Sequence, residues 1–417
     1  MSIFTPLIII SILLLNYYIF KRNSYSKSFF LLSSSFLIIY TLFSIVIYYN
    51  NLSNGFEHGI LFGNVANNHF CDEYKYYIDS DILLNHLKNG DISAWLNKEL
   101  PVYEFIDPEG HASYGNYNMF VILLTLLKAI GIKSALDLIL IKLFVYIPTS
   151  IFLYKISKLY LNEKLSLISV GVFSLLPGYI LCNSLLMRDN LIIMITIIFL
   201  YYILSKSFTW KSSIFLFILA IILFQLRAYL ILILMSTVIF TFKNSKHLIS
   251  IKDIIYLIII LFAIYFIINF NFNGSHSNIL FSYSQIKQLQ DTFKATFGIG
   301  ANMFINLFYQ TFIHIFFDPF FLNFLSSSLI YLILLSLGNI IGTMISIAFL
   351  IKFLILCFKN KNDNLTSLLK FTAYFTLLTA LLVMSKDTFI INRIALIWLP
   401  LFIIILLYSI DLISRKN

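Results

Sequence analysis

Charge is scarce in this chain: charged residues make up 12% of its 417 residues, and only 19 residues are acidic. Hydrophobic residues account for 60% of the sequence, and the mean hydropathy is +0.90. A composition so poor in charge cannot cover a soluble domain with a polar surface. It excludes a soluble protein and predicts a polytopic membrane protein of the all-α class, because a helix pairs its own backbone groups inside lipid.

Cysteine is rare, and several familiar catalytic motifs are absent. The three cysteines, Cys71, Cys182 and Cys357, are too widely spaced for a disulfide framework or a thiolate metal site, so we expect small hydrophobic residues. No phosphate-binding glycine loop, HExxH or GxSxG motif occurs. No cofactor is predicted, and a requirement for a divalent cation is left open. Four loop histidines have irregular spacing that does not favour a metal site: His58, His69, His86 and His111.

The basic residues give a net charge of +10 but do not form a nucleic-acid-binding surface. Of the 29 lysines and arginines, 17 fall in short clusters between apolar runs, as in "KRNSYSK" at 21–27. Short basic loops of this kind mark the cytoplasmic side of a membrane protein. The first apolar run has no basic residue before it and this cluster after it, which is the reverse of a signal peptide. We expect it to remain as a helix with its N-terminus outside, and we expect no nucleic-acid partner.

The apolar runs have the length of membrane spans, since about 20 apolar residues cross a hydrocarbon layer of ~30 Å. Counting from the basic loops predicts about eleven spanning helices, or up to about 13 if marginal runs at 117–131 and 301–317 also cross. We expect these two runs to be re-entrant or interfacial instead. The chain is read as one integral membrane domain, 1–417. The eleven predicted spans lie near residues 3–20, 28–49, 138–154, 165–182, 190–204, 212–226, 228–242, 253–270, 327–356, 370–384 and 394–411.

The acidic residues are concentrated in one segment, 50–116, which holds 10 of the 19 acids and only three lysines. We expect this segment to be an external loop, and 271–326 to form a second external or re-entrant segment. Four acids of the first segment fall within ten positions: Asp72, Glu73, Asp79 and Asp81.

The stretch that carries these acids, "CDEYKYYIDSDILLNHLKNG" at 71–90, predicts a short helix lying at the membrane interface. Tyr77, Leu84 and Leu87 are spaced along one side of this helix, and Gly90 is placed to end it. The acids would then lie near the lipid head groups. The alternative is a solvated acidic helix without a chemical role.

Several cations stand at predicted helix ends on the same side of the membrane as the acidic loop. An ionisable group is costly inside an apolar run, and the fork of an arginine suits phosphate oxygens. We therefore predict a substrate- or phosphate-binding role; the alternatives are snorkelling to head groups and local ion pairs. The predicted binding residues are Arg188, Asp189, Arg227, Lys386 and Arg393.

Carboxylates and arginines on one face suit a substrate with a phosphate leaving group and a hydroxyl that must lose its proton. Glycosyl transfer from a polyprenyl phosphate or diphosphate sugar has both needs.

Three motifs occur in a fixed order along the first half of the chain. They are the acidic pair Asp72–Glu73 in "FCDEYKYYIDS", Gly131 at the end of "YGNYNMFVILLTLLKAIG", and Pro177 about a dozen residues before Asp189. This order resembles the N-terminal half of the GT-C superfamily of membrane glycosyltransferases. The late stretch "NRIALIWLPLF" is similar to the Arg-to-Pro helix start of several of its families.

The resemblance implies a GT-C-like fold and a lipid-linked sugar donor. It also implies that Asp72 or Glu73 is the catalytic acid/base and that Asp189 belongs to the same external site. Two departures are the lack of a large soluble C-terminal domain and the presence of two helices before the acidic loop, where many members have one. The chain is also similar to the repeat-unit polymerases of bacterial O-antigen and capsule assembly.

These patterns together predict an integral membrane glycosyltransferase of the bacterial inner membrane, acting on its periplasmic or outer face in surface-polysaccharide assembly. Its expected partners are a polyprenyl-linked sugar donor, a glycan or lipid acceptor, and membrane lipids. The alternatives are an O-antigen repeat-unit polymerase, a transporter or lipid flippase, and a non-catalytic scaffold. Transporters often bury ionisable groups near the bilayer midplane and contain internal repeats, whereas this chain keeps most charges at predicted helix ends and shows no such repeat. Lys142 and His314 lie deeper, and we expect Lys142 to snorkel and His314 to bond to a neighbouring helix.

Overall fold

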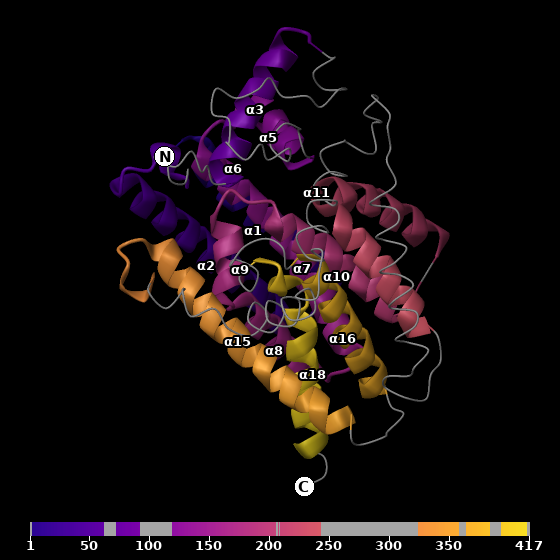
Figure 1. Cartoon of the computed structure of the whole chain (residues 1–417). Helices are drawn as coiled ribbons and strands as arrows, with labels where there is room; N and C mark the ends of the chain where they lie inside the picture. The colour runs from indigo at the N-terminus through magenta and orange to yellow at the C-terminus, as the bar shows by residue number, and fades with distance from the viewer. Residues whose placement is uncertain are drawn as a thin grey trace, which may run out of the picture.

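The described part of the chain is entirely helical, as the sequence predicts (Figure 1). The computed structural model describes residues 2–61, 72–91, 119–205, 207, 209–242, 324–357, 364–383 and 393–414. No strand occurs among these residues. The α-helices are α1 (Phe4–Arg22), α2 (Lys27–Ser53), α3 (Asp72–Lys88), α5 (Met119–Ala129), α6 (Ala135–Ile141), α7 (Tyr146–Lys158), α8 (Glu163–Ser174), α9 (Pro177–Ser184), α10 (Asp189–Ser205), α11 (Trp210–Phe242), α15 (Ile330–Cys357), α16 (Asn364–Val383) and α18 (Leu399–Ser414).

Within the described ranges, five helices are long and apolar enough to cross a membrane, or six if one bent helix pair counts as a single span. This confirms the prediction of a membrane protein. Four further apolar helices are shorter, at 10–17 residues, so the count of about eleven spans stays a prediction. The predicted span at 253–270 and nearly all of the segment 271–326 lie outside the described residues. The five candidate spans are Phe4–Arg22, Lys27–Ser53, Ala135–Lys158, Trp210–Arg227 and Ile330–Ile355.

Three apolar stretches are interrupted in the structure. The run predicted as one span at 165–182 is bent by 61° between α8 and α9, where Pro177 opens α9 and cannot continue a preceding helix. The run at 138–154 contains a 3-10 turn at Lys142–Val145 between α6 and α7. In α11 the backbone leaves the helical conformation at Arg227 (φ −154°, ψ 91°), in agreement with the two separate spans predicted on either side of this residue.

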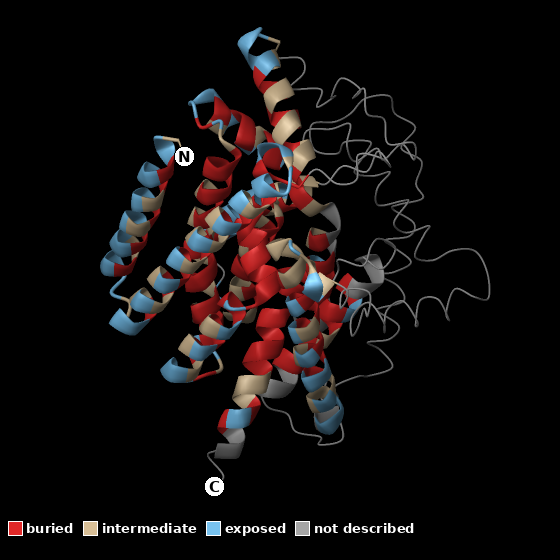
Figure 2. Cartoon of the chain, turned by 90° about the vertical axis from the view of Figure 1, so that its left-hand side faces the viewer, coloured by how far each residue is buried: buried red, intermediate tan, exposed pale blue. Residues whose placement is uncertain are grey.

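The core lies where α2, α7, α8 and α9 meet, and buried residues fill the centre of the bundle (Figure 2). Three buried tyrosines pack there: Tyr40 lies edge-on to Tyr146, with ring centroids 5.0 Å apart, and to Tyr179, at 5.9 Å. The Tyr40 hydroxyl donates to the Ser174 carbonyl at 2.8 Å, which satisfies one of the last carbonyls of α8. Apolar residues on the outer sides of α1 and α2, such as Leu14, are exposed, as expected of surfaces that face lipid.

The predicted helix at 71–90 is present as α3, and it ends before Gly90, which has a positive φ of 72°. It packs on α5. The prediction of its apolar side is partly wrong, because Leu87 is exposed whereas Tyr76 and Leu83 are buried with Leu84. Tyr76 is buried against Phe120 of α5, with ring centroids 5.2 Å apart, and the helical spacing of apolar residues could not predict that tertiary contact.

A tight turn after α2 carries the chain toward the start of α3. Gly59 in this turn has a φ of +68°, and a Cβ added there would lie 2.5 Å from Cε2 of Tyr48. Gly55, four residues earlier, also has a positive φ (+83°), but a Cβ added there meets nothing within 4 Å. An alanine at Gly55 would therefore cost only backbone strain, whereas an alanine at Gly59 would cost backbone strain and a steric clash.

We expect Gly55→Ala to lower the free energy of unfolding by roughly 1–2 kcal/mol, the usual cost of a left-handed alanine. Gly59→Ala adds a clash with Tyr48, so it should cost a further 1–3 kcal/mol or so. Unfolding of the two variants in the same detergent by circular dichroism tests this order. Equal losses would show that Tyr48 moves aside freely.

Candidate functional site

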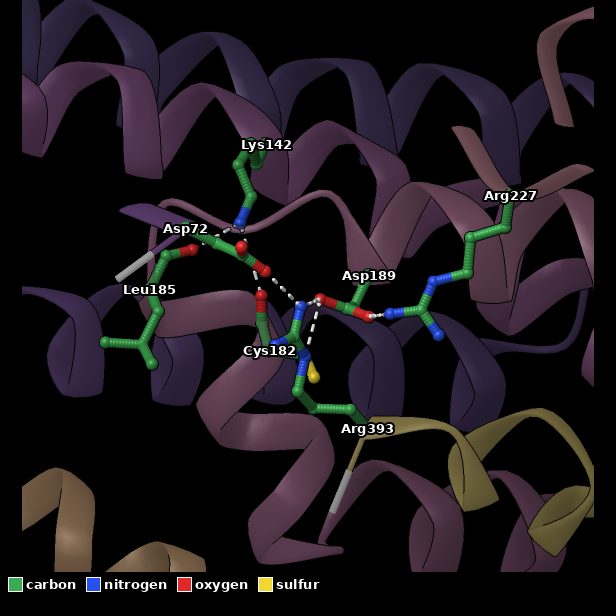
Figure 3. Close-up of polar contacts among 7 residues, drawn as sticks. All are labelled: Asp72, Lys142, Cys182, Leu185, Asp189, Arg227 and Arg393. Carbon is green, nitrogen blue, oxygen red and sulfur yellow. Dashed lines mark hydrogen bonds and ion pairs between the residues drawn. The ribbon is translucent and has the colours of Figure 1, made fainter. Parts of the chain in front are cut away.

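Segments far apart in the sequence meet at one group of charged side chains (Figure 3). Asp72 opens α3, Asp189 opens α10, and Arg188 precedes it in the α9–α10 connection. Arg227 stands at the break in α11, and Arg393 lies just before the 3-10 turn that leads into α18. We call these five residues the polar centre. Its most distant partners, Asp72 and Arg393, are 321 positions apart.

Asp189 is the carboxylate on which two of the arginines converge. Its Oδ1 accepts a hydrogen bond from Arg227 Nη2 at 2.7 Å. Its Oδ2 accepts from Arg393 Nε at 3.1 Å and Nη2 at 2.8 Å. The Asp189 side chain is only 2% exposed, and as the first residue of α10 it also faces the positive end of the helix dipole. These bonds hold α10, α11 and the segment before α18 together.

Asp72 is the accessible carboxylate of the polar centre. Its Oδ2 accepts from Arg393 Nη2 at 2.9 Å, and its side chain is 24% exposed. Burial raises the pKa of Asp72, but the charges of Arg393 and Arg188 outweigh it and hold that pKa below its ordinary value. Asp72 is therefore ionised at neutral pH and can accept a proton or a hydrogen bond from a bound molecule.

Glu73, the next residue, occupies a different environment. It is only 1% exposed; its Oε2 accepts from the Leu61 amide at 2.9 Å, and its Oε1 accepts from the Leu186 amide. Burial raises the pKa of Glu73 to about 7, although the two amide hydrogen bonds favour the ionised form. Glu73 thus joins the start of α3 to the turn after α2 and to the α9–α10 connection.

Lys142 approaches the same connection from the other side. Its Nζ donates to the Cys182 carbonyl at 3.2 Å and to the Leu185 carbonyl, at the C-terminal end of α9 (Figure 3). The side chain is buried, at 3% exposure, so the expectation that it snorkels to the surface is wrong. The peptide group between Leu185 and Leu186 is consequently held through its carbonyl by Lys142 and through its amide by Glu73. This clamp fixes the backbone just before Arg188.

Arg188 is the arginine of the polar centre that takes no part in its ion pairs. Asp72 and Asp189 are engaged by Arg393 and Arg227. In the part of the chain that the structure describes, Arg188 forms no hydrogen bond or ion pair, and its Nε is buried without a partner. The guanidinium carbon lies 5.8 Å from the centroid of the Tyr76 ring. The polar centre therefore carries three arginines for two aspartates, and the surplus cation can bind an anionic oxygen.

The structure brings together six of the seven residues predicted from the sequence as catalytic or binding; Lys386 lies outside the described residues. Sequence reasoning missed Tyr76 and read Lys142 as a surface-seeking lysine. A signal existed for both: Tyr76 follows Asp72 by one helical turn, and a lysine deep in an apolar run needs a partner. Among the described residues no group of three or more metal-ligating side chains occurs. The six residues brought together are Asp72, Glu73, Arg188, Asp189, Arg227 and Arg393.

No protein-family model, no curated protein and no solved structure matches this chain. The GT-C resemblance therefore stays a prediction.

We expect Asp189→Asn to lower the free energy of unfolding by about 3–5 kcal/mol, because it leaves two arginines at a buried position without their shared counter-charge. Asp79→Asn is the matched control. Asp79 is also a buried aspartate, within α3, but its Oδ1 has no partner among the described residues, and burial raises its pKa to about 8. Neutral asparagine should be tolerated there. Comparable losses in both variants, measured by chemical unfolding, would contradict the central role of Asp189.

The raised pKa of Glu73 predicts a pH dependence of stability. Its pKa moves from 4.5 to about 7 on folding, so its contribution is fully present below the lower value and is lost as the pH rises through the higher one. We expect thermal stability to decline between about pH 5 and 8, and the decline to be smaller in Glu73→Gln. The same variant should be less stable at every pH by about 1–3 kcal/mol, because one glutamine oxygen cannot accept from both amides. An unchanged slope in the variant would refute the assignment of this titration to Glu73.

Proposed function

We propose that this protein is an integral membrane glycosyltransferase that transfers a sugar or oligosaccharide from a polyprenyl phosphate or diphosphate donor. The observation that supports it is that the polar centre contains both Arg188, whose Nε has no hydrogen-bond partner among the described residues, and Asp72, a partly exposed carboxylate. The first suits the phosphate of a donor and the second suits the hydroxyl of an acceptor. We place this activity on the outer face of the bacterial inner membrane, in O-antigen or capsule assembly.

In the proposed reaction, the acceptor oxygen attacks the anomeric carbon of the donor and the bond from that carbon to the phosphate oxygen breaks. The bonding electron pair leaves with the phosphate, whose added negative charge Arg188 would stabilise. The proton of the acceptor hydroxyl passes to Asp72. As Asp72 gains this proton, its ion pair with Arg393 weakens, and Arg393 becomes available to the leaving phosphate.

The low pKa of Asp72 in the unliganded protein fits this scheme. Arg393 and Arg188 hold that pKa down, and a bound phosphate would neutralise part of their charge. Donor binding would then raise the basicity of Asp72 at the moment when a base is needed. Of the two carboxylates predicted as catalytic, accessibility favours Asp72, whereas the two amide bonds of Glu73 favour a role in holding the backbone.

Two alternatives differ in what the molecule moves. An O-antigen repeat-unit polymerase would use the same chemistry on a larger lipid-linked donor. The size of the transferred glycan would distinguish it from a single-sugar transferase. For a transporter or flippase, the relevant ionisable residues are Lys142 and His314, which lie deeper in apolar runs. The bonds of Lys142 to two carbonyls give it a structural use that needs no transported substrate, and His314 lies outside the described residues.

We expect Asp72→Asn to reduce glycan transfer by about 100-fold or more, the usual effect of losing a general base. The assay is the lipid-linked glycan profile, by gel and mass spectrometry, of cells that lack the protein and are complemented with each variant. Intermediates short of one sugar would accumulate for a single-sugar transferase, whereas complete single repeat units would accumulate for a polymerase.

The matched control is Asp81→Asn. Asp81 is also an acid of α3, but its side chain is 45% exposed and pairs with Lys128 at 2.8 Å, away from the polar centre. It should support a normal profile. If Asp72→Asn also gave a normal profile, Asp72 would not be the catalytic base, and the transporter alternative would be favoured.

A further inference from the structure

An aromatic ring covers the guanidinium of Arg188. Tyr76 follows Asp72 by four residues on α3, so the two side chains share one face of that helix. The Tyr76 ring is nearly buried, at 6% exposure, and the Arg188 guanidinium carbon lies 5.8 Å from its centroid. This distance is within the range in which a cation is attracted to the face of an aromatic ring.

The ring is itself held in position. Tyr76 meets Phe120 of α5 edge-to-face, with centroids 5.2 Å apart and an interplanar angle of 81°. Phe120 is fully buried, so the orientation of the Tyr76 ring is fixed by packing. A fixed ring can in turn fix the cation that lies against it.

A ring contact leaves the hydrogen-bonding capacity of arginine unused. The attraction acts on the charge of the guanidinium and consumes none of its five N–H donors. This agrees with the absence of a hydrogen-bond partner for Arg188 Nε among the described residues. Arg227 and Arg393, by contrast, spend donors on Asp189. Arg188 is thus held in place with its donors still available.

We propose that Tyr76 is a positioning residue that orients Arg188 toward the anionic phosphate of the donor. The inference rests on the proposed function, because it assigns Arg188 to that phosphate. It adds that the aromatic ring of Tyr76, and not its hydroxyl, determines how well Arg188 binds.

Binding of a polyprenyl phosphate to the full chain in nanodiscs, measured by native mass spectrometry, tests the proposal. We expect Arg188→Gln to weaken binding by about tenfold or more. Tyr76→Met, which keeps the volume but removes the ring, should weaken it by about 2- to 30-fold. The double variant should bind no more weakly than Arg188→Gln alone, because Tyr76 acts only through Arg188. Tyr76→Phe should rescue the affinity lost in Tyr76→Met.

Tyr77→Met is the matched control. Tyr77 is the next residue of α3, and its ring also contacts a cation, with Lys128 Nζ 3.5 Å from its centroid. That pair lies outside the polar centre, so the control should lose stability without losing affinity. If Tyr76→Met does not fold, fluorinated phenylalanines at position 76 give a second measurement. They withdraw electron density from the ring without changing its shape much, and affinity should fall stepwise with the number of fluorines.

The outcomes separate this inference from the proposed function. Weaker binding in Arg188→Gln with unchanged binding in Tyr76→Met would overturn the role of Tyr76 and leave the phosphate site standing. Additive losses in the double variant, or a flat response to fluorination, would also overturn it. Unchanged binding in Arg188→Gln would remove the phosphate site, and the role of Tyr76 would fall with it.

Discussion

The structure depends on one buried carboxylate between two arginines. Asp189 satisfies Arg227 and Arg393 at a buried position, and each arginine belongs to a different part of the chain. A buried ion pair gains little over apolar packing, but removal of one partner is costly, because the other charge stays buried. Beside this triad lie the partly exposed Asp72, which pairs with Arg393, and Arg188, whose Nε has no hydrogen-bond partner among the described residues.

Next to this triad, hydrogen bonds from side chains to the backbone fix the conformation of a tight connection, a task that proline or glycine often performs. The α9–α10 connection contains neither residue between Leu185 and Arg188. Its conformation is instead held by Lys142 and Glu73, which bind the two sides of a single peptide group. Charges buried in an apolar bundle can therefore hold the backbone in place, and a residue's ionisable nature alone does not identify its role.

The sequence predicted much of this arrangement and missed its finer division of roles. Hydropathy and charge placement gave the helical class, and the position of Arg227 between two apolar runs gave the break in α11. The bend at Pro177 was missed because the apolar run continues through it, although proline was visible. Asp72 and Glu73 were indistinguishable as neighbours in a sequence; only their exposure and hydrogen bonds separate them. Tyr76 was one of many tyrosines until the fold set it against Arg188.

The long separation between the partners of the polar centre has a consequence for biogenesis. Asp72 acquires its ion pair only after Arg393, 321 positions later, has been synthesised. Before then Asp189 can pair with Arg227, the earlier in sequence of its two ion-pair partners among the described residues. Arg393, in the segment before α18, therefore completes the ion pairs of α3 and α10, so the polar centre can form only after this late segment has been synthesised.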